Sequence, residues 1–309
     1  MSDTLRGLFA MVLACTIWGL SSLLYKQLAD VPPLEVLAHR TLWSLVFFAV
    51  ILTPQGRLAE IRQCLARPRF ALATAAAALA ISANWFGFIY SVQMGHAMEA
   101  SLGYYIFPLV AVLLGLFVFG DRLRPAQWVA VGIAAAAVLV LTFGLGVTPK
   151  MSLFLALTFG LYGVFKRRNT ASPMASVGAE VALLAPIAAL WLAGVHEYGW
   201  SDLTGRSGGY FGTDVTLSLL LILSGPLTGL PLMLFSYATQ RLTLPTVGLI
   251  QYLNPTLQFL CATFVFGEPF THWHAIAFPM IWTALAIYSL DSWRTARRRR
   301  VPVDKFDLA

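Results

Sequence analysis

The run from Met98 to Phe119 reads MEASLGYYIFPLVAVLLGLFVF and contains a single charged residue, Glu99. A helix needs about 20 apolar residues to cross the hydrocarbon core of a bilayer. The whole chain has the same character, because 58% of its 309 residues are hydrophobic, 11% are charged and the mean hydropathy is +0.74. Soluble domains are about 25% charged. The composition therefore predicts an all-α integral membrane protein, and it excludes an ATPase or a nucleic-acid-binding module.

Apolar runs of this kind, separated by charged or turn-forming clusters, predict ten transmembrane helices. They fall near residues 7–28, 34–52, 70–93, 98–119, 126–143, 151–165, 175–195, 215–239, 244–266 and 273–290. The sixth run is short, although Lys150 and Lys166 at its ends can reach the membrane interfaces. With ten spans and both termini cytoplasmic, 17 of the 21 Lys and Arg residues lie on the cytoplasmic side. The positive-inside rule therefore favours this multi-pass topology.

The chain also repeats itself at an offset of 147 residues. Between positions 88 and 121, eleven of 34 residues are identical to the residue 147 positions later, and FVFGD at 117–121 matches FVFGE at 264–268. Each half holds five predicted helices, an odd number, so the second half enters the membrane with opposite polarity. We therefore expect inverted repeats at 1–147 and 148–292, followed by a basic cytoplasmic tail at 293–309. Inverted repeats build many secondary transporters, with the substrate near the midplane, although duplication alone does not exclude a channel.

Several short motifs together resemble the RarD branch of the EamA transporters, within the drug/metabolite transporter superfamily. They are His39-Arg40 with Trp43, Asn84-Trp85, EASLGYYIFP at 99–108, FVFGD at 117–121, and Tyr252, Asn254 and Pro255. The resemblance covers essentially the whole chain. It implies a bundle of ten helices in two inverted repeats of five, located in a bacterial inner membrane and exporting small metabolites or drugs. Proteins of this branch are usually described through chloramphenicol sensitivity, which is a weak guide to substrate.

Ionisable residues inside membrane spans are energetically expensive and are by default candidates for function. Arg40, with His39 beside it, lies in the second run on the same predicted side of the membrane as Glu99. Arg40 and Glu99 can therefore form an ion pair at the outer vestibule, which either gates transport or only holds two helices together. Glu180 lies a few residues inside the seventh run. A lone carboxylate there suits a proton carrier, whereas an Arg or Lys from the basic loops is the alternative partner. These four residues are the predicted gating or coupling groups.

Polar and aromatic residues near the middle of the runs predict a substrate pocket. They are Trp18, Asn84, Trp85, Tyr105, Tyr252 and Asn254. Interruptions by glycine and proline are the best sequence indication of a site in such folds, and the predicted hinges are Pro108, Gly225, Pro226, Pro231 and Pro255. Aromatic and amide groups suit a neutral or amphipathic organic solute. Basic residues near the outer mouth are also compatible with an anionic substrate.

No motif for energy-yielding or catalytic chemistry is present. The chain has no P-loop, no complete zinc-protease motif and no G-x-S-x-G elbow, so we expect no enzyme, no metal and no cofactor. The basic loop after the second run is either an amphipathic helix on the membrane surface or a solvated loop. The sequence thus predicts a secondary exporter of small organic solutes that works by alternating access, by proton exchange or by facilitated flow, in contact with lipid and not nucleic acid. The rival is a non-transporting membrane protein, either an intramembrane enzyme or a scaffold, and the oligomeric state stays open.

Overall fold

The computed structural model describes residues 2–66, 68–120, 122–145, 149–166, 172–242 and 244–298. Parts of the sequence used above lie outside these ranges. They are Arg67, Arg167 and Arg168 of the basic residues counted on the cytoplasmic side, Asp121 of the first FVFGD motif, the repeat boundary at 147/148 and positions 299–309 of the basic tail. Within the described ranges the chain is almost entirely helical. Isolated bridges at Ser201–Ser207 and Phe211–Asp214 are its only β pairing there.

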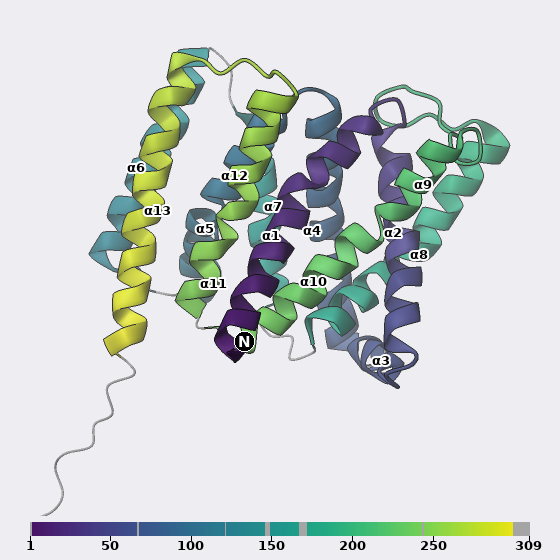
Figure 1. Cartoon of the computed structure of the whole chain (residues 1–309), viewed down its shortest axis with the longest axis horizontal. Coiled ribbons are helices and arrows are strands. Elements are labelled where there is room, and N and C mark those ends of the chain that lie inside the picture. Colours follow the sequence, from purple (N-terminus) through teal and green to yellow (C-terminus); the bar gives the residue numbers. More distant parts are fainter. Residues whose placement is uncertain are drawn as a thin grey trace, which may run out of the picture.

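Thirteen α-helices and one π-helical turn make up the described part of the chain (Figure 1). The first half contains α1 (Asp3–Gln27), α2 (Pro33–Leu52), α3 (Leu58–Ala66), α4 (Pro68–Gln93), α5 (Ala97–Phe119) and α6 (Pro125–Leu145). The second contains α7 (Lys150–Lys166), α8 (Pro173–Tyr198), α9 (Val215–Leu223), α10 (Pro226–Thr239), α11 (Leu244–Gln251), α12 (Leu253–Leu260), the π-helical turn Cys261–Val265 and α13 (His272–Arg298). Proline is the first residue of α2, α4, α6, α8 and α10, the helical position that tolerates its missing N–H.

Eight helical segments of the described chain are long and apolar enough to cross a membrane, with α9 and α10 counted as one. The helical structure confirms the prediction of an all-α chain, and these segments are consistent with a multi-pass membrane protein. Two of the ten predicted runs fall short, because α7 has 17 residues and the ninth run is divided into α11, α12 and the π-helical turn. The exact number of ten spans and the inverted repeat remain predictions.

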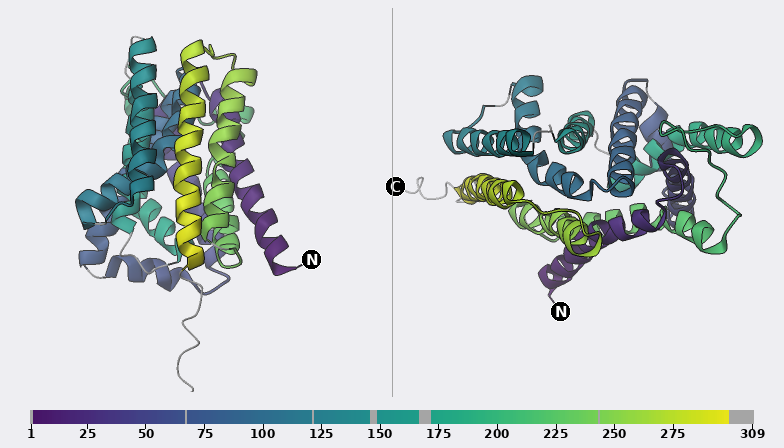
Figure 2. Two further views of the ribbon diagram at one scale, coloured as in Figure 1. Left: turned by 90° about the vertical axis from the view of Figure 1, so that its left-hand side faces the viewer. Right: turned by 90° about the horizontal axis from the view of Figure 1, so that it is seen from above.

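The bundle has two distinct ends. The N-terminus and α3 lie at one end, and the loop at 199–214 between α8 and α9 lies at the other (Figure 1). We call these the α3 end and the loop end. Seen from above, α13, α12 and α1 lie in one row, opposite α6, α7 and α4 (Figure 2).

The basic stretch after α2 forms the short helix α3, which resolves the two alternatives in favour of a helix. Arg57, just before it, donates from Nη2 to Glu60 at 2.9 Å and to Ser172 at 3.1 Å. Hydrogen bonds from Arg57 and Ser172 lower the pKa of the Glu60 carboxyl. Because Ser172 also caps α8 by accepting from the amide of Ala175, α3 is attached to the start of α8.

At the loop end, one buried carboxylate and one arginine side chain hold the connecting segments in place. The Glu35 carboxylate is fully buried and accepts hydrogen bonds from the backbone N–H groups of Gly209 and Tyr210, both at 2.9 Å. Arg206 of the same loop donates to the carbonyl of Ala29 at 2.7 Å and to the side chain of Gln93 at 3.3 Å. The loop end is therefore closed by specific hydrogen bonds as well as by packing.

Glu268, in the second copy of the FVFG motif, caps the start of α5. Its two carboxylate oxygens accept from the backbone N–H groups of Ala97 and Met98, each at 2.7 Å. We expect Glu268→Ala to lower the free energy of unfolding by about 1–2 kcal/mol, because two helix N-terminal donors lose their acceptor. Thermal unfolding in detergent, followed by tryptophan fluorescence, measures this loss.

The matched control is Glu99→Ala in the first turn of the same helix. Among the described residues, the Glu99 carboxylate pairs with His96 alone, at 3.2 Å and with half of the imidazole side chain exposed. Exposed pairs contribute about 0–1 kcal/mol. Equal losses in the two variants would contradict a capping role for Glu268.

Candidate substrate cavity

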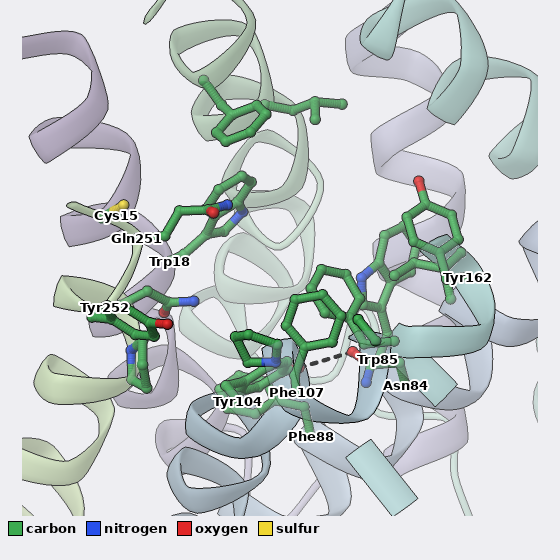
Figure 3. Close-up of a pocket in the computed structure, with 18 of the residues that line it drawn as sticks. Cys15, Trp18, Asn84, Trp85, Phe88, Tyr104, Phe107, Tyr162, Gln251 and Tyr252 are labelled. Atoms are coloured by element: carbon green, nitrogen blue, oxygen red, sulfur yellow. Dashed lines mark hydrogen bonds between the residues drawn. The ribbon is translucent and has the colours of Figure 1, made fainter. Parts of the chain in front are cut away.

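A cavity of about 890 Å³ lies inside the bundle and is lined by residues from ten of the helices. Its walls are mostly aromatic and aliphatic, with a small number of polar groups. The close-up shows Trp18, Gln251 and Tyr252 on one side of the cavity and Trp85, Asn84 and Tyr162 on the other (Figure 3). Sites for small organic molecules have this size and this mixture of apolar walls and few polar groups.

Five of the six predicted pocket residues line this cavity: Trp18, Asn84, Trp85, Tyr252 and Asn254. The prediction for Tyr105 is wrong. Its ring packs edge-on against Phe278 and Trp282 of α13, and its hydroxyl shares a 2.6 Å hydrogen bond with Thr256. Successive residues of a helix point about 100° apart, so Tyr104 faces the cavity in its place. A pattern of adjacent tyrosines does not reveal which of the two faces inward.

Asn84 lines the cavity, but its amide is already engaged by the protein. Its Nδ2 donates to the carbonyl of Leu155 at 2.9 Å and to Thr158 at 3.1 Å, and its Oδ1 accepts from the Tyr104 hydroxyl at 2.8 Å (Figure 3). These bonds tie α4 to α5 and α7. Asn84 therefore shapes the wall rather than offering a free amide to a solute.

Residues separated by the repeat offset line the same cavity. Eight pairs of lining residues are 147 positions apart in the chain. They are Cys15 with Tyr162, Ile81 with Thr228, Trp85 with Leu232, Phe88 with Phe235, Tyr104 with Gln251, Phe107 with Asn254, Pro108 with Pro255, and Ala111 with Gln258. Five of these pairs, from Phe88 with Phe235 to Ala111 with Gln258, fall inside the stretch at 88–121 that matches in sequence.

The predicted hinges differ in what they do to the helices. Gly225 and Pro226 separate α9 from α10, as expected, whereas Pro108 and Pro231 lie inside α5 and α10, which continue past them. Pro255 lies in the first turn of α12, just after the break at Tyr252. The π-helical turn Cys261–Val265 was not predicted, because no residue type marks such a turn in the sequence.

The predicted ion pair between Arg40 and Glu99 does not form, so this expectation is wrong. The Arg40 Nε donates to the hydroxyl of Thr228 at 2.9 Å, and its guanidinium lies over the ring of Trp85, 4.3 Å from the centroid. Glu99 instead faces His96, one turn away at the start of α5. Arg40 has aromatic and hydroxyl neighbours inside the bundle, and Glu99 stays near the surface.

His39 is buried beside Arg40 and stacks on Phe211 of the loop at 199–214, with 4.7 Å between ring centroids. Its Nε2 has no hydrogen-bond partner among the described residues. This contact adds to the closure of the loop end. A gating role for His39, Arg40 or Glu99 remains a proposal.

Glu180 has the basic partner that was one of its two predicted alternatives. Its carboxylate pairs with Lys166 Nζ at 2.7 Å and also accepts from Tyr162 at 3.2 Å and Ser176 at 3.3 Å. The Glu180 side chain is 1% exposed and that of Lys166 is 21% exposed. Lys166, Tyr162 and Ser176 all line the cavity. The sequence places Lys166 in a cytoplasmic basic segment but does not identify it as the residue that pairs with Glu180.

Comparison with known proteins identifies relatives along the whole chain. The model of the EamA-like transporter family matches residues 5–143. An uncharacterized transporter of Pseudomonas aeruginosa is 38% identical over 300 residues, covering 96% of this chain and 97% of that protein. The protein RarD of Streptomyces exfoliatus is 40% identical over 93% of this chain and 89% of its own length, and RarD of Escherichia coli K12 is 35% identical over 96% and 98%.

A solved crystal structure of another protein shares the fold, with a TM-score of 0.58, 20% identity and coverage of 94% of this chain and 98% of that one. This likeness concerns the fold alone. The family and the names of the relatives indicate a membrane transporter rather than an enzyme, and the apolar helices are consistent with several membrane spans. The chain belongs to the RarD branch of the EamA-like transporter family, within the drug/metabolite transporter superfamily.

Proposed function

We propose that the protein is a secondary transporter that exports small organic solutes across the bacterial inner membrane by alternating access. The observation that carries this proposal is the central cavity, because eight pairs of its lining residues are 147 positions apart, the offset at which the sequence repeats. Sites at the interface between repeats, near broken helices, are typical of secondary transporters. A solute bound there contacts both halves and can be passed from one side to the other when they rock.

The conformation described here supports loading from the α3 end. The cavity lining includes Lys166, the last residue of α7, Pro173, the first residue of α8, and Ser289 near the end of α13. At the loop end, Glu35 and Arg206 hold the connecting segments closed. With the α3 end in the cytoplasm, as the positive-inside rule favours, a solute enters from the cytoplasm. Export then requires these loop-end hydrogen bonds to break.

The breaks between α9 and α10 and between α11 and α12 supply the flexible points for this movement. Gly225 and Pro226 interrupt the eighth run and the turn at Tyr252 interrupts the ninth, whereas Pro108 removes one backbone hydrogen bond in α5. Of the two predicted coupling carboxylates, Glu180 lies beside the cavity through its partner Lys166, and we assign proton exchange to this pair. Glu99 lies away from the cavity lining.

Flux into proteoliposomes tests the transport function. Purified full-length protein is reconstituted and offered labelled pools of amino acids, metabolites and amphenicol-type drugs, with and without a pH gradient. We expect at least one pool to be transported, and Trp18→Ala to reduce that flux about tenfold or more because the Trp18 ring forms part of the wall.

The matched control is Trp128→Ala on α6, where the indole is 51% exposed and outside the cavity lining. Its flux is expected to equal that of the wild type. No flux from any pool, or equal loss in both tryptophan variants, argues against this transport cavity and favours the non-transporting alternative.

A further inference from the structure

Arg40 presents unused hydrogen-bond donors to the cavity. Its side chain lines the cavity while the residue as a whole is 7% exposed. Nε is bound to Thr228, and the guanidinium plane rests against Trp85. Within the described part of the chain, the two terminal nitrogens Nη1 and Nη2 form no hydrogen bond or ion pair.

The buried acidic groups of the described chain are all bound elsewhere. Glu35, on the same helix as Arg40, accepts from the backbone of the loop at 199–214. Glu180 is bound to Lys166, and Asp202 accepts from Thr204. The protein therefore supplies the buried guanidinium with aromatic and hydroxyl neighbours but no carboxylate.

An arginine side chain does not lose its proton in proteins, so this positive charge is permanent. A buried charge without a counter-ion is energetically expensive, and more so within a membrane span. Two parallel N–H groups of a guanidinium match the two oxygens of a carboxylate, which they bind as a fork. Thr228 fixes Nε and so leaves this fork for another partner.

The charge and chemistry of the cavity define that partner further. Among the described lining residues, Arg40 and Lys166 are the basic ones, and Lys166 is neutralised by Glu180. One net positive charge remains, which matches a single carboxylate. Around it, Trp85, Phe88 and Tyr104 form an aromatic wall suited to an apolar or aromatic body.

We propose that Arg40 binds the carboxylate of an organic monoacid whose apolar or aromatic body lies against Trp85, Phe88 and Tyr104. This proposal rests on the transport function proposed above and adds the class of its substrate. The anion completes the charge of the site, so solutes that carry a carboxylate bind more tightly than neutral solutes of the same shape.

Pairs of acids and their amides test this directly. Benzoate, phenylacetate and indole-3-acetate, each beside its primary amide, are titrated into the detergent-solubilised full chain, and binding is followed by tryptophan fluorescence and thermal stabilisation. We expect at least one acid to bind the wild type at least about tenfold more tightly than its amide. Arg40→Gln is expected to weaken binding of that acid by about 10- to 100-fold, the range for lost charge-assisted hydrogen bonds, and to leave binding of the amide unchanged.

Arg62→Gln is the matched control, because it removes the same charge from an exposed position on α3 and is expected to bind like the wild type. Arg40→Lys keeps the charge without the fork, so it is expected to keep the preference for the acid at lower affinity. If Arg40→Gln does not fold, the proposal is tested by comparing the acid and amide affinities of the wild type with those of Arg40→Lys. Equal affinity for acids and amides, no binding of any acid, or acid binding that survives Arg40→Gln overturns the proposal.

Flux measurements on the same panel separate this proposal from the transport function. If neutral solutes are transported without any preference for carboxylates, the transport function is supported and the Arg40 site is contradicted. If carboxylate binding depends on Arg40 but no solute is transported, the Arg40 site is supported and the transport function is contradicted.

Discussion

Replacing Lys166 with methionine is expected to lower the free energy of unfolding by about 3 kcal/mol or more, the usual effect of breaking a buried ion pair from one side. The reason is the asymmetry of burial, because the Glu180 carboxylate that stays behind is 1% exposed. Tyr162 and Ser176 still donate to it, but neither carries a charge. Thermal and denaturant unfolding in detergent, followed by tryptophan fluorescence, measure the change.

Glu180→Gln is expected to destabilise the protein less, because Lys166 is 21% exposed and its amine can move toward the α3 end and its water. The double variant Lys166→Met with Glu180→Gln leaves no unpaired charge and is expected to recover much of the loss. The double-mutant cycle then gives a coupling energy above about 1 kcal/mol. Simple additivity of the two single changes would falsify the pairing described here.

The same Glu180→Gln variant shows whether the pair serves proton exchange. If Glu180 couples transport to protons, the folded variant still moves substrate down its own gradient but no longer responds to an imposed pH gradient. Flux that follows the pH gradient in this variant as in the wild type places the coupling elsewhere. A wild type that ignores the gradient is a facilitator with a structural ion pair.

Gly225→Ala is expected to destabilise the protein by about 3 kcal/mol or more, at the upper end of the range for overpacking a dense interior. A methyl group at Gly225 meets the backbone and Cβ of Trp43 on α2, the latter at 2.6 Å. A backbone cannot rotate away as a side chain can, so α10 and α2 must separate. That movement also weakens the hydrogen bond from Ser44 to the Gly225 carbonyl.

Gly132→Ala on α6 is the control for this substitution, because no described atom outside the neighbouring backbone of its own helix lies within 4 Å of the added methyl group. Alanine is the better helix former there by up to about 1 kcal/mol, so the unfolding midpoint should stay the same or rise. Melting curves of the two variants, together with the amount of protein recovered from membranes, give the comparison. Similar midpoints for both would contradict close packing of α10 on α2.

The positions of the pocket residues were predictable in part, because their depth along a helix follows from counting residues. Trp18, Trp85 and Tyr252 lie at the cavity for that reason. The direction in which a side chain points was not predictable for Tyr104 and Tyr105, since an almost uniformly apolar helix has no polar face that reveals its orientation. The unbound terminal nitrogens of Arg40 and the partner of Glu180 depend on contacts between helices. Such contacts cannot be predicted by counting residues along one helix.

The sequence by itself determined that this is an all-helical membrane protein of the RarD branch. The length of the apolar runs, the distribution of Lys and Arg, and the short motifs can each be read from the order of residues alone. Only the tertiary structure decided which charges meet. Arg40 rests on Trp85 and Thr228 and not on Glu99, and Lys166 finds Glu180. The physical reason is that burial removes water as an alternative partner. A buried ionic group therefore binds the neighbour that helix packing brings within reach. Helix packing brings together residues that are far apart in the chain.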